Sequence, residues 1–443
     1  MRHSVRSRSS GPVSRVLSWA LLSACVLFAP LCHTRLIDSV ARSVIQAKHA
    51  SVGPGDLYSP WFGARAALRG ADPYAPAVTE QIESDVYGQP LTPQSHLDRM
   101  AFVYPAHLIF LMGPFTLLRW HTALFLFALL GEPLLAAASW AWMRLCLPDS
   151  TRTQMFVAVV FSISSWPAVC ASWQPTVLIL ALAAISVLLF SRGFDVVPGV
   201  MLALSTVKPN LIALLIAWLL LSAFARRRFR FVIAFGSSLS LLLLGSLLLV
   251  PGWIPRWIRV VGVYSLSSGK HALPVDLFGP RIGFAVLTFL LGAILYRLIR
   301  IGMPAPRSPA FAQAIALLLA GTAWAIPSNP WMLYNNLLLV PAVLLLYPWR
   351  PARETTAFFR AVAAGALVVS LGLGPLCAVL TSVVGYTPFV ALLPSVVNFI
   401  LPLAIAPAIL SCAGGADPSS ASADGLRMDP DSCTHHECPE IVL

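Results

Sequence analysis

The sequence predicts an all-α polytopic membrane protein, and three observations support this fold class. Hydrophobic residues make up 58% of the 443 residues, whereas charged residues make up only 11%. A soluble domain carries about 25% charged residues, so this composition is typical of a chain embedded in lipid. Most of the chain consists of hydrophobic runs near the ~20 residues that a helix needs to cross a bilayer. One long polar stretch, residues 36–105, interrupts these runs.

The hydrophobic runs give the expected spans in chain order. They cover residues 16–35, 106–118, 121–146, 154–172, 175–190, 196–207, 209–224, 231–250, 282–299, 309–326, 331–348, 358–383 and 389–411. We expect about 11 to 13 spanning helices in total. The runs 106–118 and 196–207 are too short to cross unaided, so each is expected to be a half-helix, a re-entrant segment or one end of a tilted helix.

Basic residues in the short loops predict the orientation of the chain. The arginine-rich residues 1–15 are expected in the cytoplasm, followed by a transmembrane domain over residues 16–411. Loop 36–105 is then extracytoplasmic, and the polar tail 412–443 is expected to be disordered and cytoplasmic. No convincing cleavage site follows the first helix, so it is expected to stay in an inner (plasma) membrane. The net charge of +12 follows from these loops and indicates no nucleic-acid partner.

Loop 36–105 contains seven of the eighteen carboxylates of the chain. Residues 56–70 of this loop predict a short amphipathic helix at the membrane interface, with Asp56 as its N-cap and Gly70 as its end. The expected apolar face consists of Leu57, Trp61, Ala64 and Leu68. A carboxylate at this boundary could act as a general base on an acceptor hydroxyl, or it could simply cap the helix. The two roles are compatible.

Lys208 interrupts a hydrophobic stretch and is followed by Pro209. The Lys-Pro pair is expected to break the helix and to leave a cation near the membrane surface. One reading is a phosphate-binding cation beside a helix start, and the other is a lysine that extends to the membrane surface from a helix end.

Two polar segments between spans could line a sugar or headgroup site. Gln174 lies in SSWPAVCASWQPTVL, where an interfacial aromatic belt with a proline turn is the alternative. Trp331, Tyr334 and Asn335 lie in IPSNPWMLYNN, where hydrogen bonds between helices are the alternative to sugar contacts.

These motifs together resemble glycosyltransferase family 87. The resemblance covers roughly residues 16–348. Its motifs are Asp56 with Tyr58, the Gly70–Asp72–Tyr74 step, Tyr104–Pro105, Trp173 to Thr176, the small-residue run from Gly199 to Lys208–Pro209, and Ser328 to Trp331 with Tyr334–Asn335. Two departures stand out: Ala106 replaces a second proline, and the late histidine expected after Trp331 is absent.

The resemblance implies a membrane glycosyltransferase of the GT-C fold. Its donor would be a polyprenyl-phosphate sugar, with mannose as the usual sugar, and its acceptor a lipid or glycan. Asp56 would be the general base of an inverting transfer, and Lys208 would stabilise the departing phosphate. Neither a metal nor another cofactor is implied. The implied substrate-binding residues are Lys208, Tyr58, Asp72, Tyr74, Tyr104, Gln174, Trp331, Tyr334 and Asn335.

Two other functions remain open at this point. The broken helices, together with Lys208 and Glu132 inside hydrophobic runs, also fit a lipid-linked sugar flippase or another transporter. A scaffold of a surface-polymer assembly is the third hypothesis. The sequence contains no Walker A loop, which argues against ATP-driven transport within this chain.

Overall fold

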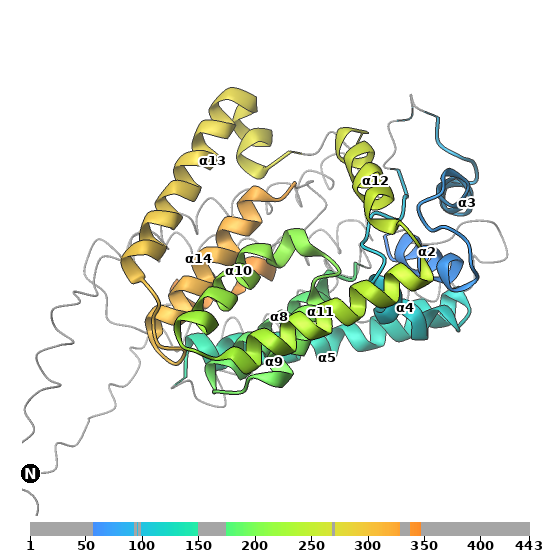
Figure 1. Ribbon diagram of the computed structural model, residues 1–443. Helices are drawn as coiled ribbons and strands as arrows, with labels where there is room; N and C mark the ends of the chain where they lie inside the picture. Colours follow the sequence, from blue (N-terminus) through green and yellow to red (C-terminus); the bar gives the residue numbers. More distant parts are fainter. Residues whose placement is uncertain are drawn as a thin grey trace, which may run out of the picture.

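The computed structural model describes residues 56–92, 95, 99–148, 174–267, 271–327 and 337–346, apart from the side chains at positions 128, 132, 343 and 346. Within these residues the fold is helical and contains no strand (Figure 1). The helices are α2 (Tyr58–Leu68), α3 (Pro76–Tyr87), α4 (Leu108–Thr116), α5 (Trp120–Cys146), α8 (Thr176–Ser191), α9 (Val196–Ser205), α10 (Pro209–Ala225), α11 (Phe229–Leu249), α12 (Trp253–Ser267), α13 (Leu273–Ile301), α14 (Pro309–Ala325) and α15 (Val340–Leu346). The all-α prediction is confirmed for this part of the chain.

Three helices, α5, α11 and α13, are long and apolar enough to cross a membrane, which indicates a multi-pass membrane protein. Four shorter apolar helices, α8, α9, α10 and α14, pack with them. Helix α4 has only nine residues, which is too short to cross a bilayer. The predicted spans 16–35, 154–172, 358–383 and 389–411 and the tail lie outside the described residues.

The bundle core is built around α8 and α14, whose side chains are mostly buried. Helix α9 packs against both α8 and α11, and a Cβ at Gly199 would lie only 2.8 Å from the carbonyl oxygen of Phe231. Glycine therefore permits the close approach of α9 to α11. By contrast, α11 and α13 expose many large apolar side chains, as expected of surfaces that face lipid.

Helices α2, α3 and α12 gather at one end of the bundle (Figure 1). Helix α2 packs on α4, and the indole Nε1 of Trp61 donates a hydrogen bond of 2.9 Å to the carbonyl of Phe115. On the other side, Gly63 lies against the ring of buried Phe102. Helix α2 ends before Gly70, whose φ of 83° is the left-handed conformation that favours glycine.

The expected helix over residues 56–70 is therefore present, with two corrections. Leu57, and not Asp56, is the N-cap, and no side chain caps this end. Three of the four expected apolar residues are buried, but Leu68 is 46% exposed. The N-cap prediction was wrong because the carboxylate of Asp56 accepts a hydrogen bond from a distant side chain instead.

The residues between the predicted spans 231–250 and 282–299 form α12 and the first turns of α13. Helix α12 is anchored by the indole of Trp257, which donates to the carbonyl of Val103 at 3.0 Å. The span predicted at 282–299 begins earlier, at Leu273, and contains a non-helical Gly279 followed by Pro280. The kink at Gly279 and Pro280 separates these extra turns from the rest of α13.

Candidate functional site

A cluster of hydrogen-bonded polar side chains joins segments that are far apart in the sequence. The amide Nε2 of Gln174 donates to Oδ2 of Asp56 at 2.8 Å. The Oε1 of the same amide accepts from Nζ of Lys208 at 3.2 Å and from the hydroxyl of Tyr104 at 3.0 Å. With Thr176, these residues form what we call the Asp56 cluster. The cluster brings together four residues that the sequence proposed for the site.

The starts of two helices determine where the Lys208 ammonium and the Thr176 hydroxyl lie. Lys208 lies at the break between α9 and α10, and Pro209 begins α10, as the Lys-Pro pair predicted. The ammonium group donates at 2.8 Å to Oγ1 of Thr176, the first residue of α8. Thr176 was quoted in the sequence motif but was assigned no role. Its hydroxyl at a helix start, directly after Gln-Pro, was the available signal.

The bonding pattern orients the Gln174 amide unambiguously. Two donors, an ammonium and a phenol, point at its oxygen, so its NH₂ group faces the carboxylate of Asp56. Burial raises the pKa of the Tyr104 phenol, and the charge of Asp56 and the neighbouring Tyr264 raise it further. Tyr104 thus stays neutral and remains a hydrogen-bond donor.

Asp72 and Tyr74 are connected to this cluster through the backbone of Tyr104. The hydroxyl of Tyr74 donates to the carbonyl of Tyr104 at 2.8 Å. One carboxylate oxygen of Asp72 accepts from the Tyr74 amide at 3.1 Å, and the other pairs with Arg256 of α12. This chain of contacts links α12 to the backbone of Tyr104.

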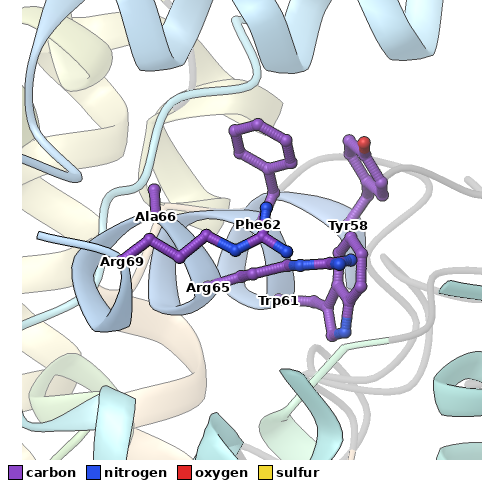
Figure 2. Close-up of a pocket in the computed structure, with 6 residues that line it drawn as sticks. All are labelled: Tyr58, Trp61, Phe62, Arg65, Ala66 and Arg69. Carbon is purple, nitrogen blue, oxygen red and sulfur yellow. The ribbon is translucent and has the colours of Figure 1, made fainter. Parts of the chain in front are cut away.

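Tyr58 forms its hydrogen bond with a residue outside the Asp56 cluster. Its hydroxyl donates to Oδ2 of Asp85 at 2.6 Å, and burial followed by this bond raises the pKa of the phenol. Tyr58 also lines a cavity of about 240 Å³ on α2, with Trp61, Phe62, Arg65, Ala66 and Arg69 (Figure 2). We call this space the α2 cavity. Two residues of one sequence motif, Asp56 and Tyr58, therefore belong to different sites.

A buried histidine that the sequence reasoning overlooked lies beside the cluster. The Nε2 of His107 is 3.1 Å from Oγ1 of Thr206, whose own hydroxyl donates to the carbonyl of Ala203 at 2.6 Å. His107 Nε2 is therefore the donor, and burial lowers the pKa of His107 to about 4. In the sequence, the only sign of its place near the cluster is that it follows Tyr104 by three residues, in FVYPAH.

Other predicted residues lie outside the described part of the chain. They are Trp331, Tyr334, Asn335 and Trp173, together with the side chain of Glu132. No protein-family model, curated protein or solved structure matches this chain. The chemistry of the Asp56 cluster is therefore the main indication of function.

Proposed function

We propose that this protein is an integral membrane glycosyltransferase. It transfers a hexosyl group, with mannose as the expected sugar, from a polyprenyl-phosphate sugar to a hydroxyl of a lipid or glycan acceptor. The observation that carries the proposal is the bridge from Asp56 through Gln174 to Lys208. A carboxylate and an ammonium held by one amide supply a base and a cation, the two groups that this transfer requires.

Asp56 acts as the general base of a single displacement. Its carboxylate takes the proton of the acceptor hydroxyl while the acceptor oxygen attacks the anomeric carbon of the sugar. The bond from this carbon to the phosphate oxygen breaks, and its electron pair leaves with the polyprenyl phosphate. Attack opposite to the leaving group inverts the configuration at the anomeric carbon.

Lys208 stabilises the charge that develops on the departing phosphate. The phosphate gains one negative charge as a diester becomes a monoester, so a cation placed there stabilises the transition state more than the ground state. Thr176 and Gln174 hold the ammonium group in place. A lysine beside the first residue of α10 also adds to the favourable potential of a helix start.

The reaction is assigned to the extracytoplasmic face. Asp56 belongs to loop 36–105, and the arginines in residues 1–15 favour a cytoplasmic N-terminus. Helices α2, α3 and α12 cover this end of the bundle, as a loop that receives a glycan would (Figure 1). The membrane domain would hold the polyprenyl tail.

Transfer of radiolabelled mannose from polyprenyl-phosphate mannose by the purified protein in lipid nanodiscs tests the proposal. Asp56→Asn keeps the shape of the side chain but removes the base, so we expect kcat to fall by about 100- to 10,000-fold. Glu80→Gln is the matched control, because Glu80 is an exposed carboxylate of α3. Its activity should equal that of the wild type.

Two results would contradict this assignment. Unchanged transfer by Asp56→Asn would remove Asp56 as the base. Absence of transfer with every sugar donor, together with movement of the labelled lipid across vesicles, would favour the flippase instead.

A further inference from the structure

The α2 cavity carries two arginines that lie on one side of its helix. Arg65 and Arg69 are one turn apart, and both side chains extend along α2 in the direction of Tyr58 (Figure 2). Like charges at this spacing destabilise an isolated helix by about 0.2–0.5 kcal/mol. An anion bound to both guanidinium groups would offset this repulsion.

No carboxylate forms an ion pair with these arginines within the described residues. The Arg65 and Arg69 side chains form no ion pair or hydrogen bond there, and Nε of Arg65 is buried without a partner. Asp85 is engaged instead by the hydroxyl of Tyr58 and, at 2.9 Å, by the amide of Gln81. A planar guanidinium with an unused donor favours a ligand that offers several acceptor oxygens.

One aromatic ring contacts the first of these arginines. The guanidinium carbon of Arg65 lies 5.0 Å from the centre of the Trp61 ring, which is a cation–π contact. Trp61 is itself buried and bonded to α4. Arg65 is therefore held over a rigid surface, and less side-chain entropy is lost when it binds a ligand.

The α2 cavity lies at the end of a candidate membrane span. The rings of Tyr58 and Trp61 are 4.9 Å and 5.3 Å from the ring of Trp120, the first residue of α5. The apolar side chains of Leu117 and Phe125, three residues before and five residues after Trp120 in the sequence, are 85% and 51% exposed. Aromatic residues at the end of a span lie at headgroup depth, and exposed apolar residues beyond them face acyl chains.

We propose that the α2 cavity binds the phosphate group of a membrane lipid. The phosphate oxygens accept hydrogen bonds from Arg65 and Arg69, and the acyl chains extend over the apolar surface at Leu117 and Phe125. The proposal is independent of sugar transfer, because it uses none of the residues of the Asp56 cluster. An inorganic phosphate could satisfy the arginines but would leave the apolar surface uncovered.

Native mass spectrometry of the delipidated full-length protein tests the proposal by measuring lipid retention. The test needs neither the sugar donor nor the acceptor of the proposed transfer. The probes are phosphatidylglycerol and diacylglycerol, which lacks the phosphate. We expect the wild type to bind phosphatidylglycerol about tenfold more tightly, and Arg65→Gln/Arg69→Gln to lose this preference. The control is Arg230→Gln, which removes an exposed arginine of α11 and should leave the preference unchanged.

Arg65→Lys provides a second variant that preserves the charge. A lysine lacks the planar fork and the Nε donor, so an intermediate preference for phosphatidylglycerol is expected. The proposal is overturned if the double variant keeps the full preference. It is also overturned if inorganic phosphate displaces the lipid at equal concentration, because the cavity would then be a site for free phosphate.

Discussion

The Asp56 cluster and the α2 cavity begin two residues apart but differ in how their charges are used. In the Asp56 cluster, a carboxylate and an ammonium are joined to one amide by hydrogen bonds of 2.8 and 3.2 Å. In the α2 cavity, two arginines have no ion pair within the described residues. A bonded network fixes the geometry of reacting groups, whereas two like charges that form no such ion pair are suited to binding an anion.

The difference follows from the helical turn at the start of α2. Asp56 lies in the turn before the helix, whereas Tyr58 is its first residue. Side chains two positions apart in such a turn point in nearly opposite directions, since a helix has 3.6 residues per turn. One segment can therefore contribute to a reaction site and, on its other face, to a lipid site.

After the loss expected for Asp56→Asn, the next largest effect comes from removing the cation of the Asp56 cluster. Lys208→Gln should lower kcat by about 100- to 1,000-fold, because the developing phosphate charge loses its closest stabilising group. Lys208→Arg should recover part of this activity. The measurement is single-turnover transfer in nanodiscs, with Arg230→Gln as the control, and phosphatidylglycerol retention should stay unchanged. An unchanged kcat and donor KM in Lys208→Gln would refute the phosphate role.

His107 provides a pH test of the packing beside the Asp56 cluster. Its pKa is about 4 in the folded protein, below the ~6.5 of an unperturbed histidine. The unfolded chain therefore binds a proton that the folded protein does not, and stability falls as pH decreases from about 6.5 to about 4. The loss attributable to this group is at most about 3 kcal/mol.

Thermal unfolding of the detergent-solubilised protein between pH 7 and 4.5 measures this effect. His107→Gln keeps a donor for Thr206 but does not titrate, so its midpoint should fall less steeply than that of the wild type. Parallel curves for the two proteins would show that His107 does not control this acid sensitivity.

The sequence predicted the elements of the Asp56 cluster better than their bonding. The helix break at Lys208 was predictable because Pro209 lacks a backbone N–H and starts a new helix. The order of motifs also placed Asp56, Gln174 and Lys208 in one proposed site. The amide bridge itself was not predictable, because it joins residues 118 and 34 positions apart through tertiary packing.

The α2 cavity was harder to predict from the sequence than the Asp56 cluster. An arginine pair four residues apart on an amphipathic helix is usually a solvated polar face, and only the structure shows its lack of carboxylate partners among the described residues. Tyr58 was assigned to substrate through its motif neighbour, although its hydroxyl bonds to Asp85. The two neighbours differ in their contacts because side-chain direction nearly reverses over two residues of a helix.

Gly63 tests whether one helix position controls both sites. A Cβ at this position would overlap the ring of buried Phe102, so Gly63→Ala should destabilise the protein by about 1–3 kcal/mol. The displaced α2 should lower both sugar transfer and phosphatidylglycerol retention. Phe102→Leu in the same chain provides space and should recover part of both. Loss of only one activity would show that the two sites respond independently to the position of α2.

The smallest effect is expected from the ion pair between Asp72 and Arg256. These side chains are 28% and 33% exposed, and such solvent-screened pairs contribute only about 0.2–1 kcal/mol. Arg256→Gln should therefore lower stability slightly, and high salt should reduce the difference from the wild type. Transfer should change little, because the hydrogen bond from Tyr74 to the Tyr104 carbonyl remains. A large loss of kcat in Arg256→Gln would instead place Asp72 and α12 within the reaction site.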